Sequence, residues 1–208
     1  VVVDDKSTDN TQSVCKNLAQ KIPNVTYLRL QKNAGQSAAV YTGVKHAKHT
    51  LIATLDGDGQ NPPSEIAKLV KAYNDFDGDK SATLFAGHRQ GRKDTQVKKL
   101  TSKIANKIRK AMLKDNCPDS GCGLKLFNKA TFLSLPHFNH MHRFLPALFK
   151  SYGLDTINVP ITHQPRQHGV SKYNTLGRLK VGIVDLFGVA WLARRACHPK
   201  IEEDDQHV

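Results

Sequence analysis

Short apolar runs and longer segments with helical spacing alternate along the first 90 residues of the chain. The runs are rich in branched and aliphatic side chains, which predicts buried strands at residues 1–3, 25–30, 51–55 and 83–87. Helices are expected between them, at residues 12–21, 37–47 and 62–74. Ser7 or Thr8 is the expected cap of the first helix. Strands that alternate with helices predict an α/β fold with mostly parallel pairing.

The second half of the chain is expected to hold more helix. Apolar residues at helical spacing in a basic segment predict an amphipathic helix over residues 96–114. Residues 120–127 predict a turn and a strand, and residues 155–159 a further strand. The stretch between them, residues 132–152, is expected to be largely helical.

The segment from Leu176 to Arg195 joins an apolar stretch to basic flanks. The apolar part, residues 181–192, is too short to span a bilayer and contains Asp185. Trp191 and the flanking cations favour an amphipathic helix that lies in the plane of a membrane interface. An ordinary terminal helix packed on the core is the alternative. The acidic end of the chain, residues 196–208, predicts a disordered tail.

The charge balance narrows the class of partner. Lys and Arg outnumber Asp and Glu by 31 to 18, so the formal net charge is +13, which favours phosphorylated substrates, an anionic membrane surface or nucleic acid. Aromatic residues are only 7% and the cations are scattered, so nucleic acid is not the expected partner. Four cysteines in 208 residues predict reduced thiols and a cytosolic setting.

Cysteines and histidines raise one alternative kind of site. A structural zinc ion could use Cys117, Cys122, His137, His140 and His142. Their spacing matches no common zinc motif, so the sequence gives this site little support.

An acidic turn directly follows the third predicted strand. Asp56, Asp58 and Gln60 alternate with glycines that let the backbone bend, so their oxygens could converge on one point. Such donors suit Mg²⁺ or Mn²⁺, and Mg²⁺ usually arrives with substrate phosphates. An ordinary polar turn is the competing interpretation.

Other polar side chains also follow predicted strands. They are Asp4, Asp5, Asn33 and Arg89. Sites in α/β sheets lie beyond the carboxyl ends of the strands, so one crevice could hold all of these groups together with the acidic turn.

Four motifs, at residues 3–11, 33–36, 56–63 and 166–173, occur in a recognisable order. Together they resemble the family-2 GT-A glycosyltransferases, specifically the branch of dolichol-phosphate mannosyltransferases and polyprenyl-phosphate glycosyltransferases. The likeness extends from residue 1 to about residue 195. The Asp-x-Asp-x-Gln-x-Pro-Pro and Arg-x-x-Gly-x-Ser-Lys-Tyr motifs are much narrower than the first.

The resemblance implies a fold and an activity. The fold would be a Rossmann-like, mostly parallel sheet flanked by helices over residues 1–165, followed by an acceptor loop and interfacial helix over 166–195. The activity would be inverting, metal-dependent transfer of a sugar from a GDP- or UDP-sugar to dolichyl or undecaprenyl phosphate. It would take place at the cytoplasmic face of a membrane, with the protein peripherally bound. Neither the sugar nor the oligomeric state follows from the motifs.

The resemblance also implies roles for single residues. Donor-binding residues would be Asp4, Asp5, Asn33, Gly35 and Asp56. The metal-diphosphate group would be Asp56, Asp58 and Gln60. The acceptor phosphate would be held by Arg89, Arg166, Ser171 and Lys172. Residues that act directly in catalysis would be Asp58, Arg89, Arg166 and Lys172.

Two departures and two alternatives accompany the resemblance. The family normally begins with a strand and a turn that close over the nucleotide, and this chain shows neither, so its first strand is expected to be missing. A hydroxyl acceptor would need a carboxylate base, for which Asp119 is the candidate. A catalytically inactive, basic membrane-binding module is the other alternative.

Overall fold

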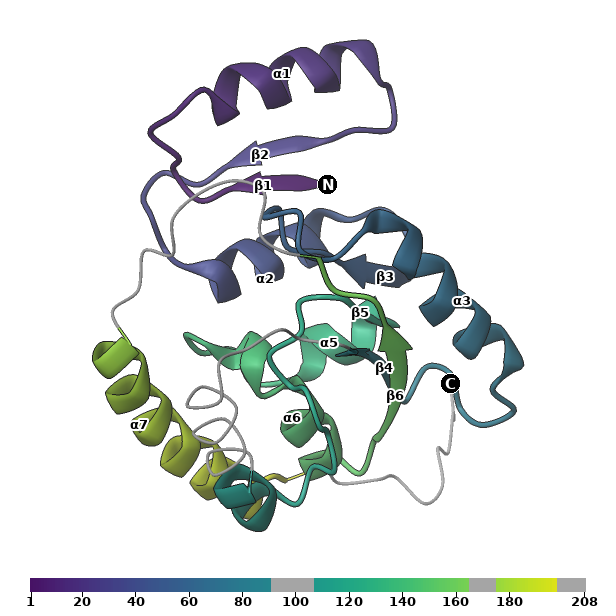
Figure 1. Cartoon of the computed structure of the whole chain (residues 1–208), viewed down its shortest axis with the longest axis vertical. Helices are drawn as coiled ribbons and strands as arrows, with labels where there is room; N and C mark the ends of the chain where they lie inside the picture. Colours follow the sequence, from purple (N-terminus) through teal and green to yellow (C-terminus); the bar gives the residue numbers. More distant parts are fainter. Residues whose placement is uncertain (91–106, 165–174, 198–208) are drawn as a thin grey trace, which may run out of the picture.

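The computed structural model describes residues 1–90, 107–164 and 175–197, and the side chains of residues 175–180 are outside the description. Strands and helices alternate in its first half as the pattern predicts (Figure 1). They are β1 (Val2–Asp4), α1 (Thr11–Lys21), β2 (Tyr27–Arg29), α2 (Gln36–His46), β3 (Leu51–Thr54), α3 (Ile66–Asp75) and β4 (Thr83–Arg89). A 3₁₀ turn, η1 (Pro63–Glu65), precedes α3.

The second half adds two strands and several helices. They are β5 (Lys125–Asn128), α5 (Lys129–Ser134), the 3₁₀ turn η2 (Met141–Arg143), α6 (Leu145–Ser151), β6 (Asp155–Ile161) and α7 (Thr175–Arg194). Residues 107–113 are also helical, which confirms the end of the helix expected over 96–114, while 91–106 are outside the described residues.

The strands form two sheets in the described part of the chain. β1 and β2 pair in parallel, and the four other strands are ordered β3-β5-β4-β6. β5 is antiparallel to both neighbours, whereas β4 and β6 are parallel. β3, β4 and β6 therefore run in one direction and β5 alone runs against them, which keeps the strand ends of β3 and β4 on the same edge.

The four-stranded sheet separates two apolar clusters. Alternation along β4 sends Leu84 and Ala86 to one face and Phe85 to the other. The first face is covered by α2, α5 and α6, and the second by α3 (Figure 1). α7 packs on α6 through Val189 and Ala190, which are buried.

Two local predictions are wrong. The first helix begins after Asn10, and neither Ser7 nor Thr8 caps it; Asp9 instead accepts a hydrogen bond from the Thr11 amide at 3.0 Å. The stretch 132–152 is broken between α5 and α6, where Pro136 follows the end of α5 and His140 has a φ of +67°. A residue before proline disfavours the helical region, and a left-handed residue ends any helix.

Candidate active site

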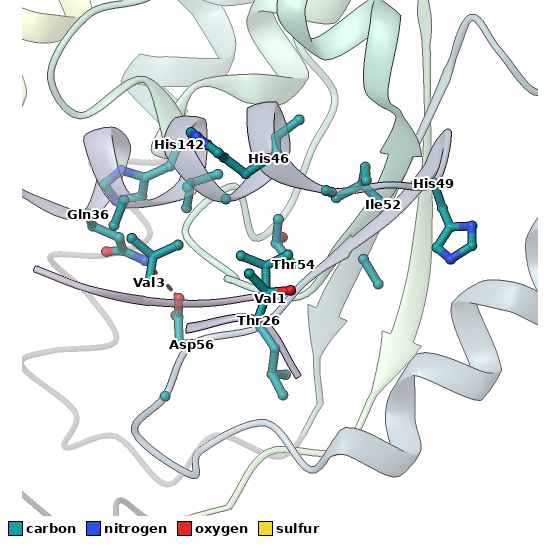
Figure 2. Close-up of a pocket in the computed structure, with 18 of the residues that line it drawn as sticks. Val1, Val3, Thr26, Gln36, His46, His49, Ile52, Thr54, Asp56 and His142 are labelled. Atoms are coloured by element: carbon teal, nitrogen blue, oxygen red, sulfur yellow. Dashed lines mark hydrogen bonds between the residues drawn. The ribbon is translucent and has the colours of Figure 1, made fainter. Parts of the chain in front are cut away.

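The Asp56–Gln60 turn lies at the carboxyl end of β3, as expected. Gln36, the first residue of α2, donates from Nε2 to Asp56 Oδ1 at 2.7 Å (Figure 2). The Gln60 amide donates to Asp58 Oδ1 at 3.1 Å, and Gly59 between them has a φ of +71°. Since glycine adopts this conformation without steric cost, the sequence fits the turn that brings Asp56 and Asp58 to one cavity.

A buried lysine lies beneath this turn. Lys125, on β5 opposite Thr54, donates from Nζ to the carbonyls of Ser120 and Cys122. Burial raises the pKa of the Asp56 carboxyl above its ordinary value; the positive charge of Lys125 opposes the rise and Asp58 adds to it. Through these two carbonyls Lys125 holds the loop before β5, and burial lowers the pKa of its own ammonium group.

Gly123 in that loop packs directly on Asp56. A Cβ at this glycine would lie 2.2 Å from Asp56 Oδ2, far inside a normal contact. Thr54 Oγ1 donates to the Gly123 carbonyl at 2.7 Å, which fixes the loop against β3. The Asp56 carboxyl is therefore held from one side by Gln36 and from the other by the backbone of Gly123.

Arg89, at the end of β4, is paired with Asp119. Its Nε donates to Asp119 Oδ2 at 2.7 Å and its Nη2 to Oδ1 at 2.6 Å, a bidentate ion pair of limited exposure. Planar pairing of this kind fixes both groups. The pair joins the end of β4 to the same loop that cradles Asp56.

One cavity of about 1330 Å³ is lined by Asp56, Asp58, Gln60 and Arg89. Among the described residues no group of three or more His, Cys, Asp or Glu could hold a metal ion. Two carboxylates and an amide are an incomplete cage, which fits a divalent cation that brings phosphate oxygens with it. The negative charge of Asp58 also adds to the rise in the pKa of Asp56, which a bound cation would oppose.

His142, which the sequence suggested only as a zinc ligand, also lines the cavity. Its Nδ1 lies 2.7 Å from Ser37 Oγ at the start of α2. Burial, with nearby Lys125, Arg143 and His140, lowers the pKa of His142 to about 3, so it is neutral near pH 7. His137 stacks edge-on against Tyr41, and the zinc group considered from sequence does not assemble in the described residues.

The four predicted donor-binding residues outside the turn make contacts with the chain itself. Asp4 is buried and accepts hydrogen bonds from the Ser7 amide and Tyr27 Oη. Asp5 accepts from the amides of Ala34 and Gly35 at 2.6 and 2.8 Å, and Asn33 donates to the Asp5 carbonyl at 3.1 Å. The structure therefore joins Asp5, Asn33 and Gly35 into one connection between β1 and the start of α2, whereas Asp4 is held by the turn after β1 and by β2. The contact of these residues with a donor stays a prediction.

The predicted acceptor loop lies outside the described residues, including Arg166, Ser171 and Lys172. The residues just before it are described. The Gln164 amide donates to the Gln60 carbonyl at 2.9 Å, and buried Glu65 accepts from the Thr162 amide and hydroxyl at 3.0 and 2.9 Å. The chain that leads into residues 165–174 is thus attached to the acidic turn.

Comparison with protein families gives a direct match. The model of a family described as "Glycosyl transferase family 2" matches residues 1–134. An undecaprenyl-phosphate 4-deoxy-4-formamido-L-arabinose transferase of Edwardsiella ictaluri is 32% identical over 177 residues, 85% of this chain and 53% of that protein. A dodecaprenyl-phosphate galacturonate synthase of Rhizobium johnstonii is 33% identical over 203 residues, 96% of this chain and 59% of that protein. The chain spans little more than half the length of these relatives.

Solved structures share the fold at low identity. Glucosyl-3-phosphoglycerate synthase from Mycobacterium tuberculosis, in complex with Mg²⁺ and uridine diphosphate, aligns with a TM-score of 0.62 and 16% identity, covering 93% of this chain and 67% of that one. Mannosyl-3-phosphoglycerate synthase from Rubrobacter xylanophilus aligns with a TM-score of 0.63 and 13% identity, covering 99% and 67%.

The packing of Gly123 on Asp56 gives a prediction about stability. Gly123→Ala should lower the free energy of unfolding by about 1–3 kcal/mol, because the new methyl group must displace the carboxyl or the loop. Gly182→Ala in α7 is the control, since its Cβ meets nothing within 4 Å. Urea denaturation measures the free energy of unfolding of both variants. Equal stability of the two would contradict the close packing of Gly123 on Asp56.

Proposed function

Because the chain belongs to glycosyltransferase family 2 and has its GT-A fold, we propose that it transfers a sugar from a nucleotide-sugar to the phosphate of a polyprenyl lipid. The transfer is metal-dependent and inverts the anomeric carbon. The support for the acceptor is the activity for which two relatives are named, an undecaprenyl-phosphate sugar transferase and a dodecaprenyl-phosphate galacturonate synthase. The support for the metal is the acidic turn together with the Mg²⁺ complex of a protein with the same fold.

One observation carries the proposal, the hydrogen bond from the Gln164 amide to the Gln60 carbonyl at 2.9 Å. It ties the turn that would grip the donor diphosphate to the chain that leads into Arg166, Ser171 and Lys172. Donor and acceptor phosphates could then be held a few residues apart, which is the arrangement that group transfer between them requires.

Each charged group has a distinct part in this reaction. Asp56, Asp58 and Gln60 would hold a divalent cation. When bound, this cation would neutralise the negative charge that develops on the departing nucleoside diphosphate. Arg89, Arg166 and Lys172 position the acceptor phosphate, with Ser171 as a further donor. A phosphate oxygen attacks the anomeric carbon while the bond to the diphosphate breaks and its electron pair leaves with the diphosphate.

The reaction needs no general base, because the acceptor phosphate is already ionised near neutral pH. Asp119, the base that a hydroxyl acceptor would need, accepts both hydrogen bonds of the Arg89 guanidinium. Both carboxylate oxygens of Asp119 are therefore engaged by Arg89. The geometry thus favours a phosphate acceptor over a hydroxyl acceptor.

Helix α7 supports a peripheral position on the membrane. None of the helices in the described residues is long and apolar enough to cross a bilayer. Val184, Phe187 and Trp191 are 68%, 62% and 62% exposed and recur at helical spacing, whereas Val189 and Ala190 are buried against α6 and its neighbours. We propose that this exposed stripe enters the interface of an anionic membrane at its cytoplasmic face, with Arg194 and Arg195 at the headgroups.

The transfer itself is tested with UDP- and GDP-sugars, a short polyprenyl phosphate, and Mg²⁺ or Mn²⁺. Asp58→Ala should lower the rate about 100-fold or more, because one stabiliser of the leaving group is lost. Asp75→Ala, a surface aspartate paired with Lys71, is the matched control and should keep the rate. Equal rates for Asp58→Ala and the parent would contradict the assignment of Asp58 to the metal site. Transfer to polyprenol, which has no phosphate, would contradict a phosphate acceptor.

Membrane binding is tested by sedimentation with vesicles that contain phosphatidylglycerol. The double variant Phe187→Ser/Trp191→Ser should bind about tenfold more weakly, because it loses apolar area that the interface would cover. Val14→Ser, a similarly exposed apolar site on α1, should bind like the parent. Unchanged binding of the double variant would rule out α7 as the contact, and vesicle binding without any donor binding would favour an inactive scaffold.

A further inference from the structure

His142 lies on the wall of the cavity near the acidic turn, and Ser37 holds it there. Ser37 Oγ lies 2.7 Å from His142 Nδ1 and 3.3 Å from the backbone nitrogen of His142. Gln36, the neighbour of Ser37 in α2, reaches Asp56 with its side chain (Figure 2). The imidazole ring therefore lies at the end of the cavity that holds the acidic turn.

The hydrogen bonds of Ser37 determine the tautomer of this ring. The backbone amide of His142 can only donate, so Ser37 Oγ accepts from it. Ser37 is 4% exposed, and the proton of such a buried hydroxyl needs an acceptor of its own. In the described part of the chain that acceptor is His142 Nδ1. A neutral imidazole whose Nδ1 carries no proton has its proton on Nε2.

The second ring nitrogen of His142 is a neutral hydrogen-bond donor. Burial lowers the pKa of His142 to about 3, so the ring keeps a single proton near pH 7. The two nitrogens of an imidazole point to nearly opposite sides, so Nδ1 faces α2 and Nε2 faces away from it. Nε2 makes no hydrogen bond with the described part of the chain, and the ring is partly exposed where it lines the cavity. Because Nε2 carries the proton, it can donate to a substrate but cannot take a proton from one.

Gln36 offers the complementary group. Its Nε2 donates to Asp56 Oδ1 at 2.7 Å, which leaves Oε1 as an acceptor that makes no hydrogen bond with the described residues. Gln36 and His142 thus present one acceptor and one donor to the same cavity. A hydroxyl group both donates and accepts, so it can satisfy the two together. An ionised phosphate oxygen only accepts, and it would leave Gln36 Oε1 without a partner.

We propose that His142 Nε2 and Gln36 Oε1 together bind one hydroxyl of the sugar that is transferred, which makes His142 a specificity-determining residue of the donor site. This assignment rests on the proposed function, because it gives this end of the cavity to the sugar of a nucleotide-sugar. If His142 only linked the η2 turn to α2, its contact with Ser37 would suffice. Loss of the ring would then disturb the binding of the sugar and of the diphosphate alike.

The tautomer is tested by long-range ¹H–¹⁵N NMR of the imidazole rings in the 208-residue chain. The signals of His142 are those that are missing from the spectrum of His142→Asn. At pH 7 they should show a protonated Nε2 and an unprotonated Nδ1. The opposite tautomer, or a ring with both nitrogens protonated, would overturn the proposal whether or not a ligand binds.

The contact with the sugar is tested by calorimetry with Mg²⁺ and UDP-glucose, UDP-galacturonate and GDP-mannose, each compared with its own nucleoside diphosphate. In His142→Asn the amide oxygen can replace Nδ1 as the acceptor for Ser37, but the side chain is too short to place a donor where Nε2 lies. This variant should bind the tightest of the three donors about fivefold more weakly and its diphosphate with unchanged affinity. His142→Gln, whose amide nitrogen reaches the position of Nε2, should recover part of the loss. His49→Asn, at the other end of the same cavity, is the control and should change neither affinity (Figure 2).

The outcomes separate this contact from the proposed function. Equal losses for the donor and its diphosphate in His142→Asn, or no loss for either, would overturn the contact with the sugar and leave the proposed function standing. A His142→Gln variant that binds no better than His142→Asn would also overturn it. If the parent chain binds none of the donors and neither diphosphate, the proposed function fails and the contact fails with it.

Discussion

The ammonium group of Lys125 has to be satisfied inside the protein, and the candidate site is organised around that requirement. An isolated buried charge is costly, and here the carbonyls of Ser120 and Cys122 accept its hydrogen bonds. The loop that supplies these carbonyls must therefore fold over β5. That fold brings Gly123 against Asp56 and Asp119 against Arg89. One buried charge thus positions groups from β3, β4 and the loop between β4 and β5.

The site is assembled from segments far apart in sequence. Gln36 begins α2, Arg89 ends β4, and Gln164 follows β6, yet each contacts the acidic turn or the loop that cradles it. The reversed strand β5 makes this possible, because it lies between β3 and β4 while their carboxyl ends stay together. A second buried carboxylate, Glu65, fixes Thr162 beside the turn and so sets where the following residues leave the sheet.

Local features of the fold could be predicted from sequence, and non-local ones could not. The strands before Asp5 and Asp56 were predicted because apolar runs and polar turns are encoded within a few residues. The reversal of β5 depends on which strands become neighbours, and periodicity carries no such information. The helical pattern over 132–152 failed because Pro136 and the left-handed His140 outweigh it. The contacts of Asp4 with Tyr27 and Arg29 join residues that lie 23 or more positions apart, which no local pattern encodes.

The position of α7 relative to the cavity links the two proposed contacts, donor and membrane. His140 Nδ1 lies 2.9 Å from Asp185 Oδ2, and α7 buries Val189 and Ala190 on the body of the protein. His140 directly precedes the η2 turn, which carries His142 and Arg143 to the cavity. The exposed stripe of α7 is therefore connected to the wall of the cavity through the His140–Asp185 contact and the short turn that follows His140. An interface that binds this stripe would hold the cavity at a fixed height above the lipid, which is what an acceptor with its phosphate at the membrane surface requires.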